Sequence, residues 1–268
     1  MPTIATLLFL GLASQATSES DKAMYPHPTD AFGAMAHGRW DRARYLLDQL
    51  TDGKKKKVNI FYVQALCEWA QSSQYNANVL TGIRWCKEYG ANFKEDDGYV
   101  LVTAINCDKW GEVVERLLQY GCDPNKPWVN RRNMNFSRTP LFASIGSGKS
   151  TKNMLTLLKF GASTEKYSEF ILDIKGSRIN ITPLMYGAEQ KDGVKLKLLI
   201  SHKAKVNAIC PEDGRTALHF AARWDCAENI SLLLKAGAKK SLRNKAGETA
   251  LDVAKKYKAK NAIAVLSK

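Results

Sequence analysis

The sequence predicts an all-α solenoid in which pairs of short helices stack in a row and are connected by β-hairpin fingers. A helix-start motif containing Thr and Leu recurs at intervals of 43, 34 and 33 residues, at Thr139, Thr182, Thr216 and Thr249. A second marker, Gly before a small residue, recurs between and before these starts, at Gly90, Gly121, Gly161 and Gly237. Self-similarity at a period of about 20 to 50 residues is typical of stacked repeats.

The clearest unit covers residues 216–238. Thr216 precedes an apolar run, where a hydroxyl group caps backbone N–H groups that have no partner inside the helix. The first helix is expected to turn inward Leu218, Phe220 and Ala221. The second helix has an apolar face at helical spacing, formed by Ile230, Leu233 and Leu234. Gly237 then supplies the left-handed residue that ends this helix.

With its Thr-Pro-Leu signature at residues 139–141 and 182–184, the chain resembles the ankyrin repeat family. The resemblance is strongest from Thr139 to Leu266 and can be followed back to Ala31, which predicts about seven units within residues 31–268. It implies a non-enzymatic module without a cofactor, which binds a partner protein on a concave face made of finger tips and first helices. His219 occupies the His position of the signature, so a structural role is expected for it.

The charge of the chain is strongly one-sided. The net charge is +14, of which residues 1–134 (16 basic, 15 acidic) contribute +1 and residues 135–268 (24 basic, 11 acidic) contribute +13. Such asymmetry indicates an acidic counterpart, which is an acidic protein, a nucleic acid or an anionic membrane surface. The alternative is that lysines at exposed helix positions only keep a long surface soluble.

Two of the fingers are longer than the family pattern. From Gly121 to Thr139 is 18 residues and from Gly161 to Thr182 is 21, whereas from Gly237 to Thr249 is 12. The long fingers carry Arg and aromatic residues, which protein interfaces favour. The candidate protein-binding residues are Trp128, Arg131, Arg132, Lys175 and Arg178 on the long fingers, with Arg215, Arg243 and Lys245 further along the basic half. A neutral surface insertion is the alternative, because loops tolerate added length cheaply.

Residues 143–150, which read ASIGSGKS, fit a loosened phosphate-binding loop. Such a loop needs a buried strand before it and a helix after it, so that backbone N–H groups wrap the phosphates. Here the repeat register predicts a first helix before the glycines. A nucleotide-binding enzyme using Lys149 is thus the third hypothesis, after a protein-binding module and a nucleic-acid or other polyanion binder.

Residues 1–16 have an apolar run followed by small residues, as in a secretory signal peptide, but no Lys or Arg precedes the run. We expect a linker at residues 17–30 and a secreted or periplasmic protein if this segment is cleaved. The alternative is an apolar segment that covers the end of the fold in a cytoplasmic protein. The six cysteines contain no Cys-x-x-Cys pair, so a zinc site is not predicted and they are expected to be small buried residues.

Overall fold

A computed structural model describes residues 40–52, 58, 63, 76–96, 98–106, 111–130, 136–148, 151–171 and 177–268 of the chain. It contains two compact units, one formed by residues 1–96 and 116–122 and the other by residues 97–115 and 123–268. Residues 1–16, expected to be a signal peptide, and the linker 17–30 lie outside the described residues.

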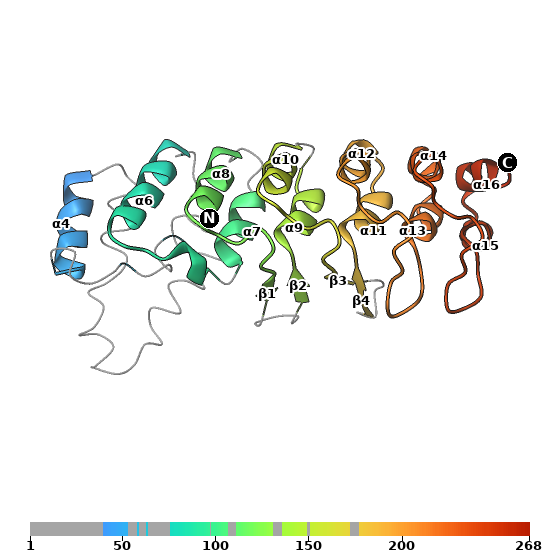
Figure 1. Ribbon diagram of the computed structural model, residues 1–268, viewed down its shortest axis with the longest axis horizontal. Helices are drawn as coiled ribbons and strands as arrows, with labels where there is room; N and C mark the ends of the chain where they lie inside the picture. The colour runs from blue at the N-terminus through green and yellow to red at the C-terminus, as the bar shows by residue number, and fades with distance from the viewer. Residues whose placement is uncertain are drawn as a thin grey trace, which may run out of the picture. The chain divides into compact units, whose positions relative to one another are not determined.

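The larger unit is a row of helix pairs, as predicted (Figure 1). Its first helices are α7 (Tyr99–Asn106), α9 (Pro140–Gly146), α11 (Pro183–Ala188), α13 (Ala217–Arg223) and α15 (Ala250–Lys256). The second helices are α10 (Lys152–Lys159), α12 (Val194–Ser201), α14 (Ala227–Lys235) and α16 (Lys260–Leu266), and α8 (Gly111–Gln119) begins in this unit. The ankyrin-type helix-pair solenoid is therefore confirmed.

Both long fingers contain short antiparallel hairpins. Strand β1 (Trp128–Asn130) pairs with β2 (Phe136–Arg138), and β3 (Ser168–Ile171) pairs with β4 (Arg178–Ile181). The alternating residues 170–174 predict a short strand in a hairpin. Strand β3 includes Phe170, aligned with Ile179, and Ile171, and residues 172–174 lie outside the described residues. In Figure 1 the hairpins project from the same side of the row as the two shorter fingers near the C-terminus.

Threonine caps begin the first helices, as the sequence predicts. The Thr139, Thr182 and Thr249 hydroxyls each accept a hydrogen bond from the backbone N–H three residues later. Pro140 and Pro183 occupy the first helical turn, where no N–H is needed. Each cap therefore satisfies a backbone donor that the helix itself leaves without a partner.

Neighbouring repeats, each made of one helix pair and its finger, are also joined by hydrogen bonds between their turns. Asn125 Nδ2 donates to the Gly161 carbonyl at 2.9 Å, and its Oδ1 accepts from the Ser163 amide at 2.7 Å. Asn207 makes the same pair of bonds to Gly237 and Lys239. Together with the buried faces of the helices, these bonds fix the spacing of the units, which supports the stacked core.

Glycines end the second helices in the left-handed conformation, with φ of 83° at Gly90, 107° at Gly121, 85° at Gly161 and 92° at Gly237. The repeat formed by α11 and α12 departs from this rule, because Lys203 adopts φ 62° at the corresponding position. A side chain in this region costs roughly 1–2 kcal/mol, so the helix end of α12 is locally strained.

We expect Lys203→Gly to raise the free energy of unfolding by about 1 kcal/mol, since it removes the strain at some entropic cost in the unfolded chain. The measurement is the urea midpoint. Gly161→Lys is the matched control and should lower stability by a similar amount, because nothing lies within 4 Å of the added Cβ and the cost is in the backbone. A lower midpoint for Lys203→Gly would contradict the assignment.

The smaller unit contains α4 (Trp40–Leu50), α6 (Asn76–Glu88) and the 3-10 helix η1 (Phe93–Glu95). The Tyr89 hydroxyl donates to Asp48 at 2.7 Å, and the Phe93 and Tyr120 rings meet edge to face at 5.2 Å. These helices match parts of the predicted N-terminal units. The total of about seven units stays a prediction, because much of residues 31–75 lies outside the described residues.

Candidate interaction surface

A buried polar residue recurs on three second helices, each time four residues before a buried leucine. It is Asn153 on α10, Lys195 on α12 and Asn229 on α14. Each donates to carbonyl groups at the end of the first helix in the preceding unit. Asn229 Nδ2, for example, donates to the carbonyls of Ala188 at 3.0 Å and Gln190 at 2.6 Å. The position is thus a shared C-terminal cap between units.

At Lys195 the capping group is a charged ammonium, whereas it is a neutral amide at the two asparagines. Its Nζ lies 2.7–3.0 Å from four carbonyl oxygens, those of Ser144, Ile145, Ser147 and Gly148. The lysine is 5% exposed, against the expectation that lysines of the basic half lie on the surface. The reason is local: an ammonium group matches the partial negative charge at the C-terminus of α9 and satisfies its carbonyls.

This arrangement bears directly on the ASIGSGKS motif. Its first residues form the end of α9, whose last residue is Gly146, and Gly148 follows this helix, so no strand precedes the glycines. The carbonyl oxygens there point at Lys195, so this end of the helix presents acceptors, whereas phosphate binding requires N–H donors at a helix N-terminus. Lys149 and Ser150 lie outside the described residues.

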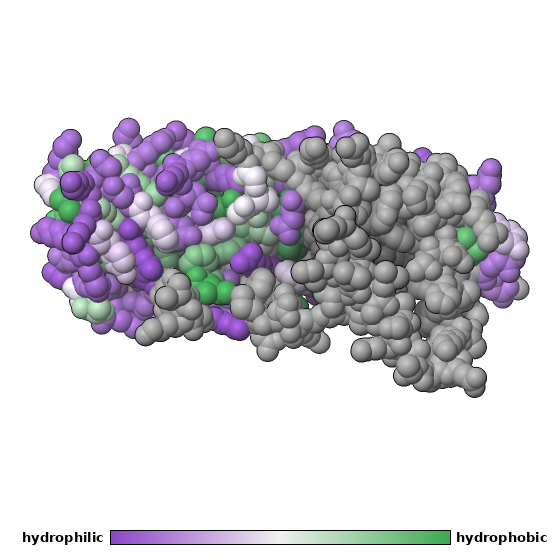
Figure 2. All heavy atoms as spheres, turned by 180° about the vertical axis from the view of Figure 1, so that it is seen from behind, coloured by the Kyte–Doolittle hydropathy of each residue, from purple (hydrophilic) through white to green (hydrophobic). Residues whose placement is uncertain are grey.

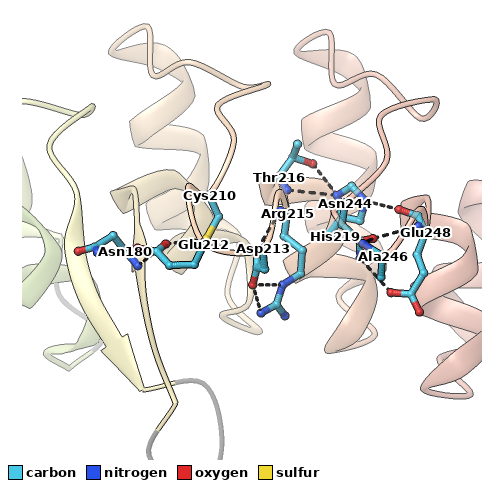
Figure 3. A network of polar contacts seen from close by, with 10 residues as sticks. All are labelled: Asn180, Cys210, Glu212, Asp213, Arg215, Thr216, His219, Asn244, Ala246 and Glu248. Carbon is cyan, nitrogen blue, oxygen red and sulfur yellow. Dashed lines mark hydrogen bonds and ion pairs between the residues drawn. The ribbon is translucent and has the colours of Figure 1, made fainter.

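The fingers near the C-terminus are joined by a polar network (Figure 3). The Glu212 carboxylate accepts from the Asn180 amide at 2.9 Å, from Asn180 Nδ2 at 2.7 Å and from the Cys210 thiol at 3.3 Å. Burial alone would raise the pKa of Glu212, but these hydrogen bonds lower it overall. One finger is thereby held to the next by a carboxylate that stays ionised at neutral pH.

Arg215, predicted as a protein contact, is instead an internal residue. It is 8% exposed, its guanidinium is paired with Asp213, and it lies over the Phe220 ring at 4.8 Å. Figure 3 shows this pair beside the finger network. Because both charges are already satisfied within the chain, we remove Arg215 from the candidate surface.

His219 has the structural role expected from the repeat signature. Its Nδ1 accepts from the Thr216 backbone N–H at 3.2 Å, so the proton must be on Nε2, which donates to the Glu248 carbonyl at 3.1 Å. Burial lowers the pKa of this imidazole, and the neutral ring holds the start of α13 to the following finger. The network in Figure 3 continues through this residue.

We define the finger surface as the predicted contact residues whose exposure the structure describes, namely Trp128, Arg178, Arg243 and Lys245. Arg178, Arg243 and Lys245 are exposed, whereas Trp128 is half-buried and packs on Tyr99 with 5.5 Å between ring centroids. Arg131, Arg132 and Lys175 lie outside the described residues. The three cations are exposed on the fingers, although Arg243 donates to the Gly247 carbonyl at 2.6 Å and Lys245 to the Pro211 carbonyl at 2.7 Å. The tryptophan packs on the fold.

A second surface, which the sequence reasoning missed, lies at the C-terminal ends of the first helices. We call it the helix-end cluster; it comprises Glu189, Arg223, Trp224 and Tyr257. Trp224 is 54% and Tyr257 49% exposed. The Arg223 guanidinium carbon lies over both rings, 5.7 Å from the Trp224 centroid and 5.1 Å from the Tyr257 centroid. Two aromatic side chains from neighbouring units are therefore bridged by one cation.

Glu189 lies behind this bridge. Burial raises the pKa of its carboxyl to about 7, although Arg223, a hydrogen bond from Trp224 and Arg215 lower it in part. Its Oε2 is buried and has no hydrogen-bond partner among the described residues. The carboxyl group is thus poised to change charge near neutral pH within the cluster.

The repeat register contained a signal for this cluster. Its members stand seven or eight residues after Thr182, Thr216 and Thr249, where each first helix has just ended or is ending. Stacking the units at those positions aligns Glu189 with Arg223, and Trp224 with Tyr257. The sequence reasoning concentrated on the lengths of the fingers and did not compare the ends of the first helices.

The described surface around the C-terminal units is mainly hydrophilic, with smaller hydrophobic areas between the polar side chains (Figure 2). Within the described ranges, no three His, Cys, Asp or Glu side chains gather as a metal site, and no helix is long and apolar enough to cross a membrane. Cys86, Cys122, Cys210 and Cys226 are buried, as expected of small core residues. Cys67 and Cys107 lie outside the described residues.

The larger unit is similar to known repeat proteins. A family model for ankyrin repeats (3 copies) matches residues 162–244 and 184–268. The Neurogenic locus notch homolog protein 1 of Xenopus tropicalis is 30% identical over 143 residues, which are 53% of this chain and 5% of that protein. The human palmitoyltransferase ZDHHC17 is 41% identical over 78 residues (29% of this chain, 12% of the relative).

The human NAD-capped RNA hydrolase NUDT12 is 36% identical over 74 residues, which are 28% of this chain and 16% of that protein. This chain therefore matches only a small part of each relative, and their activities do not transfer with the match. What the match does carry is the repeat itself, which agrees with the observed helix pairs and hairpin fingers. Residues 162–268 therefore consist of ankyrin repeats.

Proposed function

We propose that this chain is a non-enzymatic adaptor or inhibitor that binds an acidic partner protein through the finger surface. Ankyrin repeats are protein-interaction modules, and the family is generally non-enzymatic. The observation that carries the acidic partner is the charge of the last part of the chain. Residues 235–268 contain ten basic and two acidic residues, and all ten basic side chains are exposed.

The physical basis is charge complementarity. Arg243 keeps 63% of its side chain exposed although it lies 3.9 Å from Asp252, so its guanidinium can still pair with a carboxylate. A one-sided field of this kind accelerates the encounter with an oppositely charged protein, and its effect decreases as salt increases. The chain would act by covering a surface of its partner, and this role requires no chemical step.

The test uses poly-L-glutamate as the acidic probe and the full chain with Arg243→Glu and Lys245→Glu. We expect the double variant to bind the probe at least about tenfold more weakly than the parent chain. Lys197→Ala changes an exposed lysine on α12 and should bind like the parent chain. The thermal midpoint of each variant shows that the fold is kept. Equal affinity of the double variant and the parent would refute the finger surface as the binding site.

The nucleic-acid hypothesis is supported by the same positive charge and needs a test of its own. Capture of partners from a lysate is compared with and without nuclease, and the affinity for an oligonucleotide is measured against salt concentration. Phosphate contacts give a steep logarithmic dependence on salt. Loss of every captured protein after nuclease treatment would favour a nucleic-acid binder over an adaptor.

Export is a separate proposal, in which the protein acts as a secreted effector or an immunity-type inhibitor of a toxic enzyme. It is supported only by the apolar run of residues 4–13 and the small residues after it. Sequencing the N-terminus of the native protein tests it. A start near Thr17 would support export, and a start at Met1 or Pro2 would contradict it.

A further inference from the structure

The helix-end cluster differs from the rest of the charged surface, because it joins exposed aromatic rings to a cation held in place. Arg223 lies over both the Trp224 and the Tyr257 ring, which restricts its rotamers before any partner arrives. A side chain that is already ordered loses less entropy when it binds. Tryptophan, tyrosine and arginine are also the residues that most often dominate the energy of protein interfaces.

The surroundings of the cluster are positive. Lys255, Lys256, Lys258 and Lys260 are exposed at the turn between α15 and α16. Lys256 is paired with Glu248 at 2.7 Å, and the neighbouring Asp225 uses both carboxylate oxygens on the start of α16. The charge therefore favours a carboxylate from the partner, and the half-exposed rings favour an apolar side chain next to it.

The stacking geometry argues for a protein over a single-stranded nucleic acid. Bases bind by stacking on open aromatic faces. Here the Arg223 guanidinium covers one face of Trp224 and one face of Tyr257. The guanidinium edge keeps N–H donors in a planar fork, which matches a carboxylate group.

We propose that the helix-end cluster is an anchor site for a partner segment in which an acidic residue stands next to a bulky apolar or aromatic residue. The acidic residue pairs with Arg223, and the apolar side chain packs on Trp224 and Tyr257. This inference rests on the proposed protein-binding function and adds a second, chemically distinct contact to it. The finger surface attracts the acidic partner, and the helix-end cluster reads one short segment of it.

Glu189 makes the anchor sensitive to pH. The charged and titratable groups around it are Arg223, Arg215, Tyr186 and Cys226, of which only the two arginines are cationic. An ionised Glu189 competes with a partner carboxylate for Arg223, and a protonated Glu189 does not. By reciprocity, binding of the acidic segment favours proton uptake, so affinity should rise as pH falls from 8 to 6.

The experiment compares three probes on the full chain: poly-L-glutamate, a random copolymer of glutamate and tyrosine, and oligodeoxythymidylate. We expect the copolymer to bind several-fold more tightly than poly-L-glutamate. Trp224→Ala with Tyr257→Ala should remove this preference, and Arg223→Lys should weaken copolymer binding about tenfold, because Lys keeps the charge but loses the fork. Lys197→Ala is the control and should change neither affinity.

The pH arm uses Glu189→Gln, which keeps the shape of the side chain without its charge. The parent chain should bind the copolymer about threefold more tightly at pH 6 than at pH 8, and the variant should bind equally at both. Equal binding of the two acidic polymers would overturn the anchor site. An unchanged preference for the copolymer in the aromatic variants would also overturn it. So would a result in which the oligonucleotide binds the parent chain more tightly than the copolymer does and the aromatic variants lose this binding.

The two proposals fail in different ways. If the finger variants weaken binding of poly-L-glutamate and the helix-end variants change nothing, the anchor site is wrong and the acidic-partner function stands. If neither acidic polymer binds the parent chain, the acidic-partner function itself is wrong. The thermal midpoints of the helix-end variants show whether a loss of binding comes from a loss of fold.

Discussion

Lys195→Met should lower the free energy of unfolding by about 3 kcal/mol. Methionine keeps the apolar stem, so the change removes mainly the ammonium group and with it four hydrogen bonds to carbonyl oxygens at the end of α9. The Ser144 carbonyl keeps the Ser147 hydroxyl as a donor, whereas the Ile145 carbonyl belongs to a buried residue and loses the ammonium. Unsatisfied buried acceptors cost roughly 1–3 kcal/mol each, and the relief of no longer burying a charge offsets part of the loss.

The measurement is the denaturant midpoint, together with amide exchange at the end of α9, which should open more readily than the rest of the repeats. Lys195→Asn copies the residue found at Asn153 and Asn229 and should recover part of the loss. Lys197→Met lies on the same helix, is exposed, and should change stability by less than about 0.5 kcal/mol. If Lys195→Met were as stable as the parent chain, the hydrogen bonds from Lys195 to the carbonyls at the end of α9 would not contribute to stability.

Glu189→Gln should stabilise the protein at pH 8 by about 2–3 kcal/mol and leave it nearly unchanged at pH 4.5. Burial raises the pKa of Glu189 to about 7 from its ordinary value of 4.5. Between these values the folded state retains a proton that the unfolded state releases, so the stability of the parent chain falls as pH rises. Above pH 7 both states are ionised, and the full cost of the buried charge remains.

Glutamine imitates the protonated carboxyl group, so it avoids that cost at high pH. Thermal unfolding of the parent chain and the variant across pH 4.5–8.5 measures the difference. Glu228→Gln, at an exposed position on α14, is the matched control and should show no comparable pH dependence. A difference between Glu189→Gln and the parent that is the same at pH 4.5 and pH 8 would mean that Glu189 titrates normally.

Much of the fold could be predicted from the residues alone. The positions of Thr139, Thr182 and Thr249 placed the starts of the first helices, because a cap residue acts on the backbone within its own turn. Gly161 and Gly237 placed the ends of the second helices, because only a residue that tolerates positive φ fits there. The repeat register places Lys203 in this series. It does not predict that the Lys203 backbone adopts the strained left-handed conformation.

The candidate surface was less predictable. Trp128, Arg178, Arg243 and Lys245 were expected to be exposed because they stand in fingers, and for the three cations this is correct. Arg215 was expected to be exposed on the same grounds, but it pairs with Asp213 and lies over the Phe220 ring inside the fold. Sequence proximity to a finger does not determine whether a long side chain points outward or finds an internal partner.

By itself the sequence determined the repeat, its caps and turns, and the one-sided charge, because each of these depends on residues close together in the chain or on a simple count. Only the tertiary structure decided that Lys195 caps α9, that one carboxylate oxygen of Glu189 is buried, and that Trp224 and Tyr257 share one cation. These contacts join different units, and their energies depend on burial and on distances that are set only once the helix pairs have stacked.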